Sequence, residues 1–295
     1  MHTGGYHLLT EAPIPGSSPT VRRRQLGMEL RRLREAAHKT QDEAAAYLEI
    51  DSTVVSRHES GKVRVSVPQL RSYMQLYGVG SPEADYLLQL CRDAAQRGWF
   101  ARFGKTVPDW FRDYLGMESA AAEVWTWEPL FVPGLLQARA YTEAVSAADN
   151  PNRSSDEIQR IAQLRIDRQQ RLTADDPLIL RAIIDEAALR REVGGPDVMR
   201  TQLEHLTKVT ELPNITLQVI PFGVGAHRGM RGAFTALRFP EEPMNTVYLE
   251  LYREALYVEA PGEVANYTDT FEELAQIALS STDTAELIGK MIREK

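Results

Sequence analysis

The chain of 295 residues has one cysteine, Cys91, and lacks any long apolar run. A single cysteine excludes an internal disulfide and a zinc site built from several thiolates, and we expect Cys91 to be a small buried residue in a helix. No stretch approaches the roughly 20 apolar residues that span a bilayer. Residues 1–20, MHTGGYHLLTEAPIPGSSPT, lack the basic and then apolar pattern of a secretory signal and predict a flexible segment. We therefore expect a cytoplasmic protein.

Catalytic signatures are also missing. The sequence contains no HExxH or GxSxG motif, and the polar groups that could form an active site are scattered along the chain. They are His205, His227, Asp185 and Glu186. Helix-like EAALRR directly follows Asp185, so an N-cap is the simpler role for that residue. We expect no enzyme, no cofactor and no metal site; loss of an activity on mutation of His227, with other functions untouched, would favour the enzyme alternative.

Positive charge is scarce overall but unevenly distributed. The net charge is −7, yet residues 1–80 carry 11 Lys and Arg against 8 Asp and Glu, a net charge of +3. The remaining residues carry 23 basic against 33 acidic side chains, a net charge of −10. Because an acidic body repels phosphate, any nucleic-acid contact is expected in the N-terminal part.

Helical patterns are abundant in residues 21–95, which predict a compact all-helical domain. Leu26, Leu30 and Leu33 recur at helical spacing in the first helix, over residues 21–37. Four more helix starts are indicated by N-cap or first-turn residues at Thr40, at Asp51 or Ser52, at Ser66 and at Ser81. Glu43 follows Thr40 at the spacing of a capping box.

Residues 96–295 predict a larger α/β domain. A strand, a helix and a strand follow one another over residues 178–185, 195–212 and 215–222, which predicts parallel strands joined by a right-handed crossover. Further helices are expected at about 109–124, 137–148, 155–173 and 261–279, and further strands at GAFTALRF, TVYLELY and ALYVEA. An aromatic cluster from Trp99 to Phe131 is interpreted as core, with a ligand pocket as the alternative. The Gly-rich segment 223–232 is interpreted as a connecting loop rather than an anion cradle, because it lacks the Gly-Lys-Ser/Thr ending of a P-loop.

The two short helices within TQDEAAAYLEIDSTVVSRHESGK, residues 40–62, have the pattern of a helix-turn-helix. Small and apolar side chains would let these helices cross closely: Ala44, Ala45, Leu48 and Val55. The other face offers hydroxyls, methyl groups and a guanidinium, which suit base edges, thymine methyl groups and phosphate. Its residues are Ser52, Thr53, Val54 and Arg57. A helical pair that only packs is the alternative, and the run Arg22–Arg24 fits a solvated helix end and a phosphate contact equally well.

The segment LRRLREAAHKTQDEAAAYLEIDSTVVSRHESGK resembles the helix-turn-helix of the phage-repressor-like (XRE) regulators. Their pattern is an Arg seven residues before a Gln, then an apolar residue, a Glu and a Gly. Here these residues are Arg34, Gln41, Val55, Glu59 and Gly61. The resemblance implies a five-helix, lambda-repressor-like domain, an ion pair between Arg34 and Glu59, and a register-fixing role for Gln41.

The same resemblance implies which side chains contact DNA. The DNA-facing positions are occupied by Gln41, Ser52, Thr53, Val54 and Arg57, and a basic loop against phosphate is matched by Lys62 and Arg64. His58 departs from the pattern, because the family usually has an apolar residue there. We expect looser packing of this helix or sensitivity to pH.

A second resemblance covers the C-terminal part. YLGMESAAAEVWTWEPLFVPGLLQARAYTEAV and the segment from IIDEAALRR to TALRFP are similar to the C-terminal domain of actinobacterial WhiJ-like, antitoxin-like regulators. The resemblance implies a transcriptional regulator that binds a double-stranded DNA operator, with a small BldB-like protein as partner. We further expect a homodimer, since one recognition helix covers too few base pairs for useful specificity. A small-molecule effector bound by the C-terminal domain is the alternative.

Overall fold

The computed structural model describes residues 18–240 and 242–294. Residues 1–17, most of the predicted flexible segment, lie outside this description. The first helix begins at Pro19, two residues ahead of the expected start of the helical domain, and Ser18 and Thr20 are already buried.

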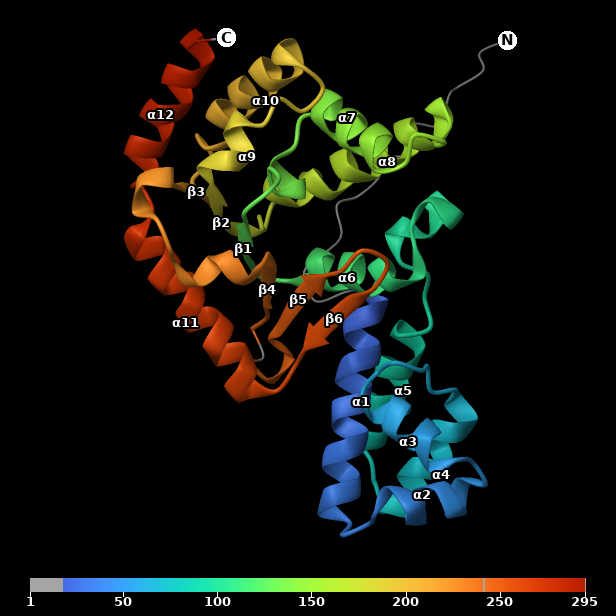
Figure 1. Ribbon diagram of the computed structural model, residues 1–295. Helices are drawn as coiled ribbons and strands as arrows, with labels where there is room; N and C mark the ends of the chain where they lie inside the picture. The colour runs from blue at the N-terminus through green and yellow to red at the C-terminus, as the bar shows by residue number, and fades with distance from the viewer. Residues whose placement is uncertain (1–17, 241, 295) are drawn as a thin grey trace, which may run out of the picture.

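Five helices follow in residues 19–93, as the sequence predicts (Figure 1). They are α1 (Pro19–Ala36), α2 (Gln41–Leu48), α3 (Ser52–Glu59), α4 (Val67–Tyr77) and α5 (Glu83–Asp93). Leu26, Leu30, Val55 and Tyr73 are almost fully buried in the core that these helices share. Cys91 is buried within α5, which confirms its expected role.

The later described residues combine helices with one mixed sheet. The helices are α6 (Asp109–Ala120), α7 (Arg139–Asp149), α8 (Ser155–Gln169), α9 (Glu186–Arg190), α10 (Pro196–Val209), α11 (Pro261–Ile277) and α12 (Ser281–Glu294). The strands are β1 (Glu123–Glu128), β2 (Ile179–Asp185), β3 (Ile215–Ile220), β4 (Phe234–Arg238), β5 (Thr246–Glu250) and β6 (Ala255–Val258). Their order is β3-β2-β1-β4-β5-β6, in which β1, β2 and β3 are parallel and the other neighbours are antiparallel. The predicted strand–helix–strand unit is therefore confirmed, as β2, α10 and β3.

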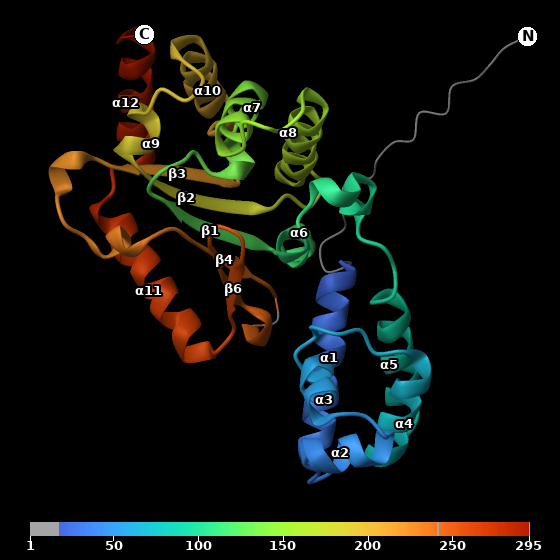
Figure 2. The same cartoon turned by 45° about the vertical axis from the view of Figure 1, so that its right-hand side comes forward.

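Helices cover both faces of this sheet (Figure 2). On one face α11 packs over an apolar cluster that includes Trp125, Trp127 and Phe271. A larger cluster, with Tyr114 and Tyr141, lies under α6, α7, α8 and α10. Most of the aromatic segment is thus core, as predicted.

The elements at residues 109–128 and 281–294 differ from the prediction. The helix expected to reach residue 124 ends at Ala120, and the aromatic segment EVWTWE forms the central strand β1. Its side chains are buried on both faces, so it lacks the alternation of a half-exposed strand. Beyond α11, Ser281–Glu294 forms the unpredicted helix α12, which packs on β3 and α10. The Gly-rich segment is a connection between β3 and β4, shaped by short 3-10 turns, as predicted.

Candidate nucleic-acid interface

Local hydrogen bonds set the start and end of the two short helices. Thr40 accepts from the Glu43 backbone N–H at 3.1 Å while the Glu43 carboxylate accepts from the Thr40 N–H at 2.8 Å, which completes the capping box. Helix α2 ends where Glu49 adopts a left-handed conformation, and Asp51 then caps α3 by accepting from the Thr53 N–H at 2.8 Å.

Helix α3 has a buried and an exposed face. Val55, His58 and Glu59 are buried against the other helices. The approach to α1 is close, because a Cβ on Gly27 would lie 2.5 Å from the Glu59 carbonyl oxygen. The opposite face is open, with Thr53 and Arg57 exposed. A rigidly seated helix therefore presents this face to solvent.

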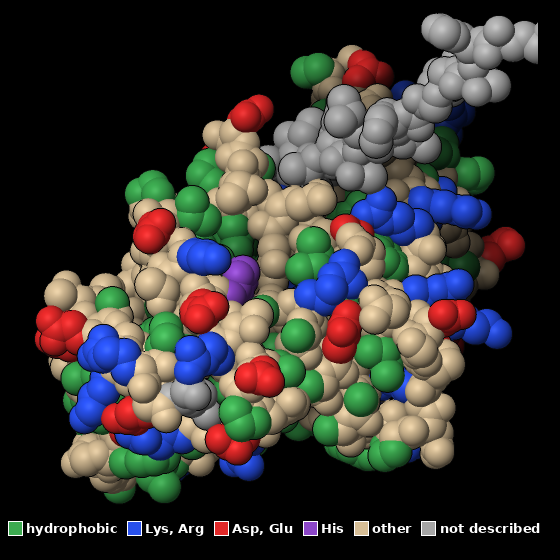
Figure 3. Space-filling model, turned by 90° about the horizontal axis from the view of Figure 1, so that it is seen from above, with side chains coloured by type: hydrophobic (Ala, Val, Ile, Leu, Met, Phe, Trp, Pro, Cys, Tyr) green, Lys and Arg blue, Asp and Glu red, His purple; other side chains and the backbone are tan. Residues whose placement is uncertain are grey.

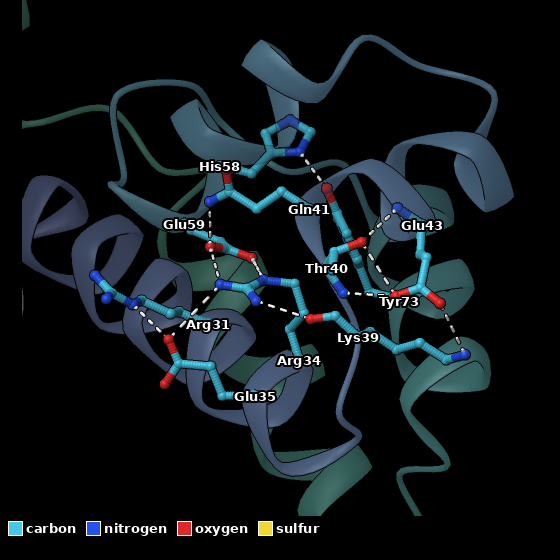
Figure 4. A network of polar contacts seen from close by, with 10 residues as sticks. All are labelled: Arg31, Arg34, Glu35, Lys39, Thr40, Gln41, Glu43, His58, Glu59 and Tyr73. Atoms are coloured by element: carbon cyan, nitrogen blue, oxygen red, sulfur yellow. Dashed lines mark hydrogen bonds and ion pairs between the residues drawn. The ribbon is translucent and has the colours of Figure 1, made fainter.

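The carboxylate of Glu59 joins three helices (Figure 4). It accepts from Arg34 Nε at 2.6 Å and Nη2 at 3.1 Å, and from Gln41 Nε2 at 2.8 Å. Arg34 also donates to the Lys39 carbonyl at 2.9 Å, and its hydrogen bond to Glu59 is the first cause of its raised pKa. The side chains of Glu59 and Arg34 are 4% and 12% exposed. This bidentate pair thus fixes α3 on α1, while Gln41 ties in the start of α2.

His58 is accommodated by a polar partner rather than an apolar site. It is 1% exposed, and its Nδ1 lies 3.0 Å from the hydroxyl of Tyr73 on α4. Burial lowers the pKa of His58, which favours the neutral ring. His58 is therefore buried and hydrogen-bonded, and sensitivity to pH stays a prediction.

The structure brings most of the predicted DNA-facing residues onto one surface. Thr53 and Arg57 are exposed on α3, and Ser52 and Val54 beside them are half-buried. Gln41 is half-buried at the start of α2, with its amide nitrogen engaged by Glu59. The loop after α3 exposes Lys62 and Arg64, and it is held to the helix because the Lys62 N–H donates to the Arg57 carbonyl at 2.9 Å.

Arg23, in the arginine run at the start of α1, has partners that the sequence did not indicate. Arg23 on α1 donates through Nε to the carbonyl of Gly61, the residue from which the basic loop starts. Its Nη2 pairs with Asp113 of α6 at 2.7 Å. The guanidinium of Arg23 is bonded within the protein. It is therefore neither part of a solvated helix end nor free to contact phosphate, the two roles that the sequence allowed for this arginine run.

The residues weighed for catalysis have separate structural roles. Asp185 caps α9 by accepting from the Ala187 N–H at 2.8 Å, and Glu186 accepts from the Phe222 N–H at 2.9 Å. His227 packs edge-on against Trp127, and burial lowers the pKa of His205 within α10. Among the described residues no group of three or more His, Cys, Asp and Glu side chains is placed to hold a metal ion.

Comparison with protein families identifies two regions. Residues 25–87 match a helix-turn-helix domain of the XRE type, and residues 111–290 match a domain of unknown function, DUF5753. The chain belongs to the DUF5753 family. No curated protein and no solved structure matches it. The helix-turn-helix domain indicates DNA-binding regulation and points to a regulator rather than an enzyme.

The DUF5753 region contains a pocket of about 470 Å³ between the Gly-rich loop, the end of β5 and α11. Arg228 and Arg231 line it together with Asn266 and Phe234. Arg228 is partly neutralised by Glu273 at 2.7 Å. None of the helices in the described parts of the chain is both long and apolar enough to cross a membrane.

Proposed function

We propose that this protein is a sequence-specific transcriptional regulator of the antitoxin-like type, which binds its operator as a homodimer in the cytoplasm. Its DUF5753 region would receive a signal from a small BldB-like partner protein. The observation that best supports DNA binding is the fixed position of α3. The helix is fixed to α1 and α2 through the buried Glu59 carboxylate, and its opposite face is open.

The chemistry of this open face suits the major groove. The hydroxyls of Ser52 and Thr53 and the guanidinium of Arg57 can bond base edges, and Val54 can contact a thymine methyl group. Gln41 keeps its amide oxygen as an acceptor, since its nitrogen bonds Glu59. Phosphate contacts are assigned to Lys62 and Arg64, which are exposed in the following loop.

Charge supports contact at this end of the molecule. The N-terminal part has a positive balance and the remainder a negative one. Figure 3 shows the face opposite the helix-turn-helix, where acidic and basic side chains are intermixed. By this balance duplex DNA would be attracted to the N-terminal part, which carries α3, and repelled by the net negative charge of the remainder. Two copies related by a two-fold axis would place two recognition helices on two half-sites.

The test compares the DNA affinity of variants at Arg57 and Lys62, two basic residues with different proposed roles. It uses a duplex selected by the protein from a random library. Arg57→Ala should cost about 1–3 kcal/mol on the selected duplex and relax sequence preference. Lys62→Ala should weaken all duplexes alike and reduce the salt slope by about one. Lys105→Ala, which removes an exposed charge outside the helix-turn-helix, is the control and should have little effect. Equal losses for Arg57→Ala and Lys62→Ala on selected and random DNA would contradict these roles.

A second candidate is supported by the pocket beside α11. Arg231 and the apolar wall suit a small molecule with an acidic group and an apolar body, while Arg228 is paired with Glu273 and the Glu250 carboxylate also lines the pocket. Such a ligand would act as an effector in place of the partner protein. A thermal-shift screen of small carboxylic acids against the whole chain tests this alternative. Stabilisation that persists in Arg231→Ala would place binding elsewhere.

A further inference from the structure

Helix α1 is shared between the two parts of the protein (Figure 1). Val21 in its first turn belongs to the core of the C-terminal part, whereas Leu26 and Leu30 belong to the core of the helix-turn-helix. The contact at the first turn is close, since a Cβ on Gly116 of α6 would lie 2.3 Å from the Thr20 hydroxyl oxygen. Helices α1 and α6 are therefore in direct contact.

Arg23 lies where these two cores meet. Its guanidinium bonds the Gly61 carbonyl on one side and Asp113 of α6 on the other, the latter at 2.7 Å. The Arg23 side chain is 23% exposed and that of Asp113 is 48% exposed. One side chain thus links the C-terminal part to the turn that follows the recognition helix.

The backbone around Gly61 has little freedom. Its φ of +65° is left-handed, and a Cβ there would lie 2.8 Å from the Cα of Arg24. The next two amides, of Lys62 and Val63, donate to the Arg57 carbonyl at 2.9 and 3.1 Å. A shift of Gly61 would therefore change both the end of α3 and the start of the loop that carries Lys62.

We propose that Arg23 is a positioning residue for the DNA-contacting loop, and that Asp113 makes its position depend on the state of the C-terminal part. A signal received by that part would reach the loop through α6, Asp113, Arg23 and Gly61. This inference rests on the proposed function, because it assigns the route by which that function is regulated. The chain of contacts physically connects the signal-binding site of the C-terminal part with the DNA-contacting loop, so that binding at one site changes the affinity of the other.

The link can be cut without separating the two parts. Arg24, the next residue on α1, is bonded to Glu259 and lies 3.3 Å from the Thr246 hydroxyl oxygen. Val21 packs in the C-terminal core and holds α1 there independently of the ion pair of Asp113. Asp113→Ala therefore removes the anchor of Arg23 while α1 remains docked.

The experiment uses the full chain with Arg23→Met and Asp113→Ala. Asp109→Ala is the matched control, because Asp109 lies on the same helix, carries the same charge and is 96% exposed in a pair with Arg112. Hydrogen exchange of the Lys62 and Val63 amides reports on the loop, and binding to a duplex selected by the wild-type chain reports on function. We expect Arg23→Met and Asp113→Ala, the two linked variants, to exchange these amides faster. Both should bind the selected duplex about five- to tenfold more weakly, at the low end of coupling between sites. Asp109→Ala should match the wild type in both measurements.

Unchanged exchange at Lys62 and Val63 in both linked variants would overturn the proposal. An equal rise in exchange across all of α1–α5 would also overturn it, because that result describes general destabilisation rather than positioning. If the wild-type chain selects no duplex, the proposed function fails. The exchange comparison between Asp113→Ala and Asp109→Ala then still decides whether the link positions the loop.

Discussion

Replacement of Glu59 by alanine tests the arrangement that fixes α3 against α1 and α2. The change removes a carboxylate that accepts from two nitrogens of Arg34 and one of Gln41. It leaves a guanidinium that is only 12% exposed, with the Lys39 carbonyl at 2.9 Å and the Glu35 carboxylate at 3.7 Å as remaining partners. The variant therefore contains a largely buried charge without its main partner.

The size of the effect follows from that burial. Breaking a buried ion pair by removing one partner costs about 3–5 kcal/mol, and the residual contact of Arg34 with Glu35 favours the lower end. A loss of about 3 kcal/mol lowers the melting temperature of a domain of this size by roughly 12–24 °C. Arg34→Met combined with Glu59→Leu should recover much of the loss, because an apolar pair needs no charge compensation.

Calorimetry can follow this change in the whole chain. All four tryptophans lie at or beyond Trp99, so tryptophan fluorescence reports on the C-terminal part and serves as an internal control. A double-mutant cycle on Arg34 and Glu59 should give a coupling energy far above that of the exposed pair Arg31 and Glu35, which water and salt screen. Strictly additive effects at Arg34 and Glu59 would refute the reasoning and remove the support for a fixed α3.

Two further predictions concern the contacts of α3 with its neighbours. Because burial lowers the pKa of His58 below its ordinary value of 6.5, the unfolded chain binds a proton that the folded chain does not, and stability of the N-terminal helices should fall as the pH drops below about 6.5. His58→Leu combined with Tyr73→Phe should reduce the change of stability with pH in calorimetric scans between about pH 5 and 8. If stability changes with pH as much as in the wild type, other titratable groups cause the effect. Gly27→Ala should lower stability by about 1–2 kcal/mol, since a clash with the Glu59 carbonyl outweighs the gain in helix propensity. Met28→Ala, at an exposed neighbouring position, is its control, and equal melting of the two variants would contradict the close approach of α1 and α3.

The N-terminal helices could be predicted because their signals are local. Thr40 and Glu43 are close in sequence, and their hydrogen bonds define the start of α2 whatever the rest of the chain does. The contact between Arg34 and Glu59 spans 25 positions, and spacing alone could not supply it. The prediction of this ion pair depended on the resemblance to a family in which the two positions are paired.

The missed features depend on distant neighbours. Strand β1 follows α6 almost directly, and its residues form a strand because β2 and β4 lie on either side of it. Ser281–Glu294 has an amphipathic pattern, but its apolar side needs β3 and α10 to cover it. Arg23 bonds Asp113 across 90 positions, so no local signal could separate it from the neighbouring arginines.

Because α1 packs against both parts, a boundary between residues 95 and 96 does not separate two independently packed domains. Such a boundary cuts the chain at a loop, but α1 crosses the packing boundary, because Val21 and Arg24 are bound by the C-terminal part. A fragment that ends at residue 95 loses Asp113 as well as any dimer contact made by the C-terminal part. Weak DNA binding by that fragment would therefore have two sources. Asp113→Ala in the full chain isolates one of them, since it removes the pair between Arg23 and Asp113 and leaves the rest of the C-terminal part in place.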